Sequence, residues 1–169
     1  MDSQANALFL PASSCLMWAR ATKRCADELL AGLATRVPRD RSLVTEHFFV
    51  IASMKLKDWC DVLQALHPPF AETCQIIFEV VTEDVKDVRD MREHDDEYLQ
   101  GNGRHKQRYT YSTDRFSADA SSTVVDEGRY LIGGRVHVES IVAAVDRFLQ
   151  ELIKQLPDVN LDWLGKQVP

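Results

Sequence analysis

Apolar side chains recur at helical spacing along the first part of the chain. A first helix is predicted to begin at Ser13 and Ser14, whose hydroxyls can accept hydrogen bonds from free backbone N–H groups, and to end before Pro38. A second is predicted from about Ser42 to His67. Their expected buried positions recur every three or four residues: Cys15, Trp18, Thr22, Cys25, Leu29 and Leu33, then Val44, Phe48, Ala52, Leu56, Trp59, Leu63 and Leu66.

Two further helices are predicted downstream. The third, of about 30 residues, should start at the proline pair Pro68 and Pro69 and end at residues 101–103, whose glycines tolerate positive φ. Its first half is apolar, whereas residues 89–98 are strongly charged. The fourth ends at Pro157, and its apolar residues fall on one face: Ile141, Val145, Phe148, Leu152 and Leu156.

Residues 104–136 have a different pattern. Residues 108–112, 122–125 and 129–132 are strand-like, and Glu127–Gly128 between the last two suggests a hairpin turn. The sequence therefore predicts a mainly α fold: a four- to five-helix up-down bundle in one domain, residues 1–169, with a small β-hairpin insertion before the last long helix. Trp163, in the tail 157–169, is a candidate contact with the bundle.

Composition narrows the class of protein. The chain has 169 residues, of which 45% are hydrophobic and 27% charged, and this suits one soluble domain with a core. A net charge of −6 argues against a surface that is basic throughout, as a general DNA or lipid coat needs, but leaves a local basic patch open. No apolar run approaches the roughly 20 residues of a membrane span. We expect a cytoplasmic protein without membrane contact.

The four cysteines, Cys15, Cys25, Cys60 and Cys74, fall in predicted helices on or beside apolar positions. They show no Cys-x-x-Cys spacing and no nearby histidine pair. We therefore expect reduced cysteines in the core; disulfides or a zinc site are the alternatives.

The charged half of the third helix is the most unusual segment. Arg89 with Glu93, and Arg92 with Asp96, stand at i,i+4 spacing, where each pair contributes a few tenths of a kcal/mol to a helix. One interpretation of the segment is thus a solvated helix with local ion pairs.

A second interpretation depends on Arg89, Asp90 and His94. An arginine, a polar residue directly after it and a histidine a few residues later resemble the signature of the HEPN superfamily (higher eukaryotes and prokaryotes nucleotide-binding domains). The resemblance implies an α-helical bundle with the motif in a late helix. It also implies a metal-independent endoribonuclease of a defence or toxin–antitoxin system, a homodimer whose two motifs line one cleft, and a protein antitoxin as a possible partner.

These residue types suit RNA cleavage without a metal. His94 can act as base or acid because histidine titrates near neutrality, and Arg89 can bind two phosphate oxygens. Asp90 lies one turn before His94 and could orient its imidazole. On an ideal helix positions 89 and 94 are about 140° apart, so a two-fold dimer would bring Arg89 toward His94 of the partner subunit. The alternative for His94 is a surface histidine paired with Asp90 or stacked on Tyr98.

A basic stretch, residues 104–111, follows the charged helix and contains interleaved tyrosines. Basic side chains there could hold phosphates while a tyrosine stacks on a base. The alternative is a solvated loop that neutralises the acidic residues 93–97. The candidate substrate-binding residues are Arg92, Arg104, Lys106, Arg108 and Tyr109.

No metal or other cofactor is predicted. Asp87, Asp90 and His94 share a helix face, but a second histidine or a glutamate at ligand spacing is missing. The sequence thus predicts a HEPN-like protein that cleaves RNA, or binds RNA or a nucleotide, as a homodimer. The alternative is a non-catalytic helical interaction or nucleotide-binding module that uses the same charged helix as a partner surface.

Overall fold

The computed structural model describes residues 3–35, 39–103 and 106–156, and helices make up most of it. The predicted Arg104 and the tail with Trp163 lie outside the described residues. The helices are α1 (Ser3–Thr35), α2 (Arg39–Leu66), the 3-10 turn η1 (Pro68–Phe70), α3 (Ala71–Phe78), α4 (Glu83–Glu93), α5 (Asp95–Leu99), α6 (Lys106–Tyr109) and α7 (Val138–Gln155). The strands are β1 (Thr110–Ser112), β2 (Ser117–Asp119), β3 (Thr123–Asp126), β4 (Arg129–Ile132) and β5 (Val136–His137).

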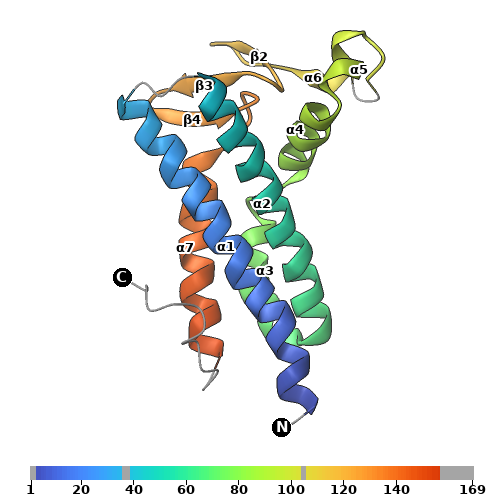
Figure 1. The fold of residues 1–169 in the computed structure, drawn as a ribbon, viewed down its shortest axis with the longest axis vertical. Coiled ribbons are helices and arrows are strands. Elements are labelled where there is room, and N and C mark those ends of the chain that lie inside the picture. The colour runs from blue at the N-terminus through green and yellow to red at the C-terminus, as the bar shows by residue number, and fades with distance from the viewer. Residues whose placement is uncertain (1–2, 36–38, 104–105, 157–169) are drawn as a thin grey trace.

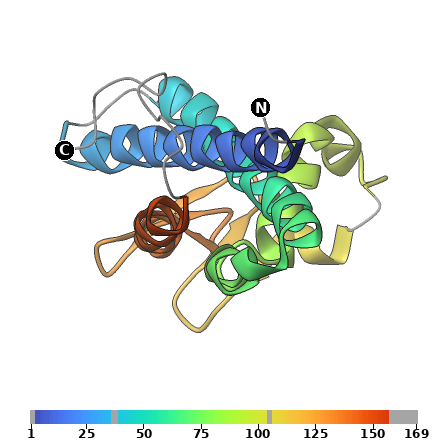
Figure 2. The same ribbon diagram turned by 90° about the horizontal axis from the view of Figure 1, so that it is seen from below.

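The long helices run up and down along one axis, and the strands cover one end of them (Figure 1). Helix α2 packs against α1, α3 and α4, while α7 packs against α1 and α3. Seen from below, α1 lies obliquely across the other helices (Figure 2). The mainly α fold, with a small antiparallel insertion before the last helix, is confirmed.

Helix α7 confirms its predicted apolar face. The five positions Ile141, Val145, Phe148, Leu152 and Leu156 are all buried. They belong to one hydrophobic core with residues of α1, α2, α3 and α4. The spacing of one apolar face predicts these buried residues because α7 packs on the core with one side only. On its other side Lys154 and Glu151 form an exposed ion pair.

The predicted buried face of α2 is wrong at its ends. Val44, Phe48 and Leu66 are more than half exposed, at 58%, 57% and 58%. Three α-helices and the turn η1 pack on α2, so its buried surface is wider than one stripe and lies about one position further along. It consists of Thr45, Glu46, Phe49, Val50, Ala52, Ser53, Met54, Leu56, Cys60 and Leu63.

The predicted start of the first helix is also wrong. Helix α1 begins at Ser3 and continues through Pro11. The Ser13 hydroxyl donates a hydrogen bond back to the Leu10 carbonyl oxygen, 2.9 Å away, instead of capping a helix start. A serine within a helix commonly donates such a bond to a carbonyl oxygen of the preceding turn. The residue type alone therefore does not distinguish a serine inside a helix from one that caps its start.

The predicted third helix is divided into several helices. Helix α3 ends at Phe78, and α4 starts after Thr82, whose hydroxyl accepts a hydrogen bond from the Asp84 amide at 3.3 Å. The threonine cap, followed by Glu83 and Asp84 in the first turn, favours a new helix start at this point. A second break at His94 separates α4 from α5.

The insertion contains the predicted hairpin and two additions to it. Strands β3 and β4 pair antiparallel with Val124 opposite Leu131, and the turn between them has positive φ at Glu127 and Gly128. Strand β5 extends this sheet, and β1 pairs with β2 in a separate two-stranded sheet. Of the predicted strand 108–112, only 110–112 is extended, because Arg108 and Tyr109 belong to α6.

The four cysteines are free thiols, and Cys15, Cys60 and Cys74 are fully buried, whereas Cys25 is partly exposed. Hydrogen bonding with the thiols of Cys15 and Cys74, together with burial, raises the pKa of Cys60 far above its usual range. The prediction of reduced core cysteines therefore holds for three of the four.

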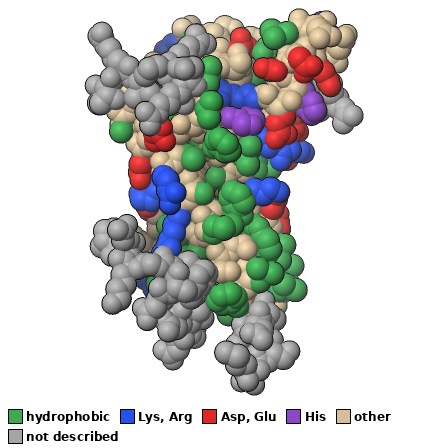
Figure 3. Space-filling model, viewed as in Figure 1, with side chains coloured by type: hydrophobic (Ala, Val, Ile, Leu, Met, Phe, Trp, Pro, Cys, Tyr) green, Lys and Arg blue, Asp and Glu red, His purple; other side chains and the backbone are tan. Residues whose placement is uncertain are grey.

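One face of the molecule carries a column of hydrophobic side chains, and charged and histidine side chains gather toward its upper end (Figure 3). The exposed large hydrophobic residues of the two helices drawn in front are Phe9, Leu10 and Met17 on α1, and Val44, Phe48, Val62 and Leu66 on α2. In the described ranges, none of the helices is long and apolar enough to cross a membrane.

Two glycines with positive φ allow a test of the packing between the sheet and α4. A Cβ on Gly133 (φ +61°) would lie 2.9 Å from Cγ2 of Val88, whereas one on Gly128 (φ +76°) would meet nothing within 4 Å. We expect Gly133→Ala to lower the free energy of unfolding by about 2–4 kcal/mol, from backbone strain plus overpacking. Gly128→Ala should cost only the strain, about 1–2 kcal/mol. Urea unfolding measures both, and equal losses would contradict the close packing.

Candidate functional site

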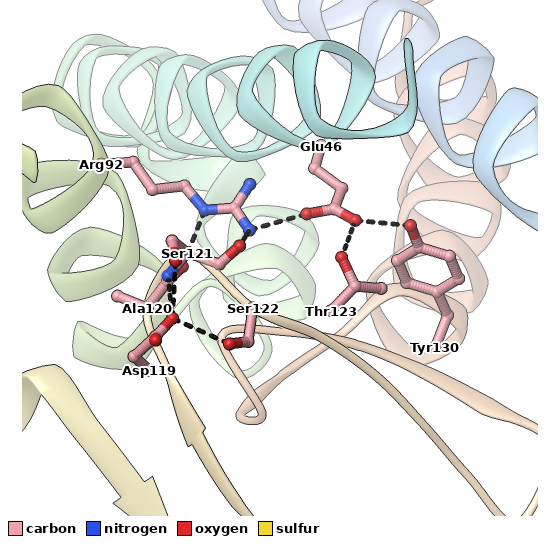
Figure 4. Close-up of polar contacts among 8 residues, drawn as sticks. All are labelled: Glu46, Arg92, Asp119, Ala120, Ser121, Ser122, Thr123 and Tyr130. Atoms are coloured by element: carbon pink, nitrogen blue, oxygen red, sulfur yellow. Dashed lines mark hydrogen bonds and ion pairs between the residues drawn. The ribbon is translucent and has the colours of Figure 1, made fainter. Parts of the chain in front are cut away.

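A fully buried carboxylate, Glu46 of α2, joins four elements of the fold (Figure 4). One carboxylate oxygen, Oε2, lies 2.6 Å from Nη2 of Arg92 on α4. The other, Oε1, accepts hydrogen bonds from the Tyr130 hydroxyl of β4, at 2.5 Å, and from the Thr123 hydroxyl of β3. A buried charge is costly unless it is paired and hydrogen-bonded, and here both oxygens have partners.

Arg92 is fixed by the loop before β3 as well as by Glu46. Its Nε donates to the Ala120 carbonyl oxygen at 2.8 Å, and Nη2 also lies 3.5 Å from the Ser121 carbonyl oxygen. The side chain is only 8% exposed. In Figure 4 the other terminal nitrogen, Nη1, has no dashed line to any residue drawn. The guanidinium is therefore held on two sides, and Nη1 has no hydrogen-bond partner among the residues that the structure describes.

Asp119 holds the same loop in place. Its Oδ1 accepts hydrogen bonds from the Ser121 amide at 3.0 Å, the Ser121 hydroxyl at 2.6 Å and the Ser122 hydroxyl at 2.8 Å. Burial acts to raise the pKa of Asp119, but the hydrogen bonds outweigh it and lower the pKa below its usual value. The carboxylate is thus stabilised in the charged form that orders the carbonyl groups facing Arg92.

A cavity of about 230 Å³ opens beside Arg92, and we call it the Arg92 pocket. Polar groups come from α2, α4, α5 and the loop before β3, and apolar groups come from Leu43, Met91 and the Tyr109 ring. The full lining is Leu43, His47, Met91, Arg92, Asp95, Tyr109 and Ser121. An imidazole, a guanidinium, a carboxylate and a phenol thus share one small cavity.

Tyr109 is held in the pocket by an aromatic stack. Its ring lies 5.0 Å from the ring of Tyr98, with an interplanar angle of 14°. Tyr98 in turn packs so closely on Gly103 that a Cβ there would come within 2.6 Å of Cγ of the ring. Tyr109 also packs against the small core cluster that contains Tyr98, Met91 and Ala120, and the rest of its ring lines the pocket.

The predicted catalytic residues lie next to this pocket but are not gathered in it. Arg89 is paired with Asp90, with Nε 2.9 Å from Oδ1, and lies 3.8 Å from Oε2 of Glu93. His94 is 59% exposed, and its Nδ1 lies 3.7 Å from Oε1 of Glu97. Asp90 therefore contacts Arg89, and the structure gives no contact between Asp90 and His94. The predicted ion pair between Arg89 and Glu93 is present, whereas Arg92 pairs with Glu46 instead of the predicted Asp96.

The remaining predicted substrate-binding residues have different positions. Arg92 and Tyr109 line the pocket, Lys106 is exposed on α6, and Arg108 forms an ion pair with the buried Asp87. The pairing of Arg108 neutralises a carboxylate inside the fold, so this guanidinium is less available for phosphate than the sequence suggested. Among the residues that the structure describes, no group of three or more His, Cys, Asp or Glu side chains could hold a metal ion.

The site residues predicted from the sequence did not include Glu46, His47 or Tyr130; the Arg41–His47 spacing also matches the arginine–histidine pattern, but its arginine is not followed by Asn, Asp or His. A signal for the first was present: Glu46 stands three and four residues before Phe49 and Val50, at core spacing on α2. A carboxylate on a core-facing stripe predicts a buried partner, because an unpaired one would be too costly. His47 and Tyr130 gave no comparable signal, since only the tertiary fold brings them to this end of the bundle.

Comparison of the chain with protein-family models, curated proteins and solved structures found no match.

The buried pair makes a strong prediction about coupling. We expect Glu46→Leu or Arg92→Leu alone to lower the free energy of unfolding by about 3–5 kcal/mol, because each leaves a buried charge without its partner. The double variant should lose clearly less than the sum of the two. Urea unfolding in a double-mutant cycle measures this, with Glu151→Leu, which breaks an exposed pair, as the control expected to cost at most about 1 kcal/mol. Additive losses would contradict the pairing.

The Tyr130 hydroxyl makes a prediction about alkaline stability. Burial, and then the hydrogen bond to Glu46, raise its pKa above the usual range. In the unfolded chain tyrosine ionises near pH 10, so above this pH the unfolded state loses a proton that the folded state keeps. The contribution of Tyr130 is therefore complete below about pH 10 and falls by up to about 1.4 kcal/mol per pH unit above it.

Urea unfolding at a series of pH values measures this loss as the difference between wild type and Tyr130→Phe. The variant should be less stable at neutral pH by about 1 kcal/mol and less sensitive to alkali. Tyr111→Phe, which removes the hydroxyl of a tyrosine that is 38% exposed, is the control and should keep the wild-type pH dependence. Parallel curves for wild type and Tyr130→Phe would contradict the assignment.

Proposed function

We propose that the protein is a HEPN-like, metal-independent endoribonuclease whose active site comprises the end of α4 and the adjoining Arg92 pocket. The observation that carries the proposal is the collection of side chains on one short segment: Arg89 and His94 reach solvent, and Arg92 and Asp95 line the pocket beside them. The pocket would hold part of one nucleotide, and the motif residues would act on a neighbouring phosphate.

The chemistry of the proposal balances without a metal. A base takes the proton of the ribose 2′-hydroxyl, and the 2′-oxygen attacks phosphorus. The bond from phosphorus to the 5′-oxygen breaks, and an acid gives that oxygen a proton, so the products carry a 2′,3′-cyclic phosphate and a 5′-hydroxyl. Histidine serves as base or acid near neutral pH, and arginine stabilises the negative charge that develops on the phosphate oxygens.

A homodimer would bring Arg89 and His94 to one phosphate more readily than a single chain does. Within one chain, Arg89 is paired with Asp90 and Glu93. A second copy of the segment would place another Arg89 and His94 beside the same phosphate, so that one residue of each type could come from each subunit. The competing carboxylates favour the alternative that the segment is a non-catalytic partner surface, and the experiment below separates the two.

The test is cleavage of 5′-labelled single-stranded RNA in the presence of EDTA. We expect cleavage to products with cyclic phosphate ends, and a loss of at least about 100-fold in rate for His94→Ala, the usual range for removal of a general acid or base. Because His94 is largely exposed, the free energy of unfolding should not change. His137→Ala, outside the segment, is the matched control and should cleave normally.

Two results would overturn parts of the proposal. Wild-type protein that cleaves none of a varied set of RNAs would remove the ribonuclease function and favour the interaction module. Normal cleavage by His94→Ala would leave the activity in place but remove the assignment of the site to His94.

A further inference from the structure

We propose that the Arg92 pocket recognises a guanine base. The inference deepens the proposed function and depends on it only for RNA as the source of the base. Three properties of the pocket carry it: the balance of charge around Arg92, the donor and acceptor side chains that line the cavity, and the ring of Tyr109 in its wall.

The charge balance favours a neutral ligand group over a phosphate. The charge of Arg92 is compensated at 2.6 Å by Glu46, and Asp95 adds a negative charge at the rim. An anion in the cavity would therefore gain little net attraction and would be repelled by the Asp95 carboxylate. A neutral group that accepts from arginine and donates to a carboxylate has neither disadvantage.

The polar groups match one edge of guanine. Nη1 of Arg92, the terminal nitrogen left free by Glu46 and the loop carbonyls, can donate to the O6 oxygen. Asp95 is an acceptor, and no ion pair or hydrogen bond of its carboxylate is found within the described ranges. It can accept from the N1–H and N2–H groups that lie beside O6. Arginine is the usual partner of guanine oxygen, and only guanine has an acceptor next to two adjacent donors.

The apolar wall fits a flat ring. Tyr98 stacks on one face of the half-buried Tyr109 at a ring separation of 5.0 Å, and the part of the Tyr109 ring that lines the cavity can stack on a base. Base–aromatic stacking adds affinity without distinguishing one base from another. The cavity of about 230 Å³ is below the size of a typical drug-sized site, so it suits a single base and not a longer ligand. Stacking thus supplies affinity, while Arg92 and Asp95 supply selectivity.

The experiment is calorimetric titration of the wild-type protein with GMP, IMP, AMP, CMP and UMP. We expect GMP to bind about tenfold or more tightly than AMP, CMP or UMP, the usual discrimination of a good paired contact. IMP keeps O6 and N1–H but lacks the N2 amino group, so it should bind more weakly than GMP. Equal affinity for GMP and AMP, or no binding of any nucleotide, would overturn the proposal.

Variants locate the contact. Asp95→Asn should remove most of the difference between GMP and IMP, because an amide has one acceptor oxygen where the carboxylate has two, and its NH2 group would face one of the two base N–H donors. Asp96→Asn is the matched control, since Asp96 is the next residue, is exposed and does not line the pocket, and it should keep the difference. Tyr109→Leu should weaken all five nucleotides alike. An unchanged GMP-to-IMP ratio in Asp95→Asn would overturn the assignment.

Short RNAs distinguish the source of the base and separate this inference from the proposed function. Tighter binding of a uridine pentamer with one central guanosine than of GMP identifies RNA, and equal affinity identifies the free nucleotide. Cleavage of RNA without preference for guanosine would contradict the guanine pocket and leave the ribonuclease intact. Selective guanine binding without cleavage would do the reverse.

Discussion

The buried ion pair between Glu46 and Arg92 is the constraint on which this end of the molecule depends. A carboxylate and a guanidinium that are both buried must stay paired. Removing either one leaves the other as an unpaired buried charge and lowers the free energy of unfolding by several kcal/mol. Because the two residues sit on α2 and α4, and because Thr123 and Tyr130 bring in the hairpin, the pair sets how the small sheet lies on the helices. The pocket beside Arg92 follows from that placement.

Periodicity in the sequence predicted what one element can determine by itself. Helix α7 has one apolar face and one neighbouring layer, so its buried residues follow from spacing alone. The hairpin of β3 and β4 is local too, because Glu127–Gly128 supplies the turn that its register requires. The buried face of α2 does not follow from spacing, since three α-helices and the turn η1 bury more than one stripe of it and leave Val44 and Phe48 in solvent.

The site could be predicted only in part, for the same reason. The charge of the segment around Arg89 and His94 is unusual for a bundle helix, and the sequence therefore predicts a site there that includes Arg92 and Tyr109. That helix is divided at Thr82 and His94, and on the resulting α4 Arg92 points inward to Glu46 while Arg89 pairs with Asp90. The spacing of residues along the helix does not determine the partner of Arg92, because Glu46 is distant in the sequence and only the tertiary fold brings it close.

The net charge of the whole chain and the local charge around Arg92 both argue against binding by long-range electrostatic attraction. At −6, the protein lacks the long-range attraction that gathers nucleic acid without regard to sequence. Around Arg92 the charge is compensated by Glu46, so the binding that we propose there would depend on short-range hydrogen bonds and stacking, which are sensitive to the identity of the group bound. In the proposed site the compensated arginine would supply selectivity at one position, and its ion pair with Glu46 would keep the geometry that such selectivity needs.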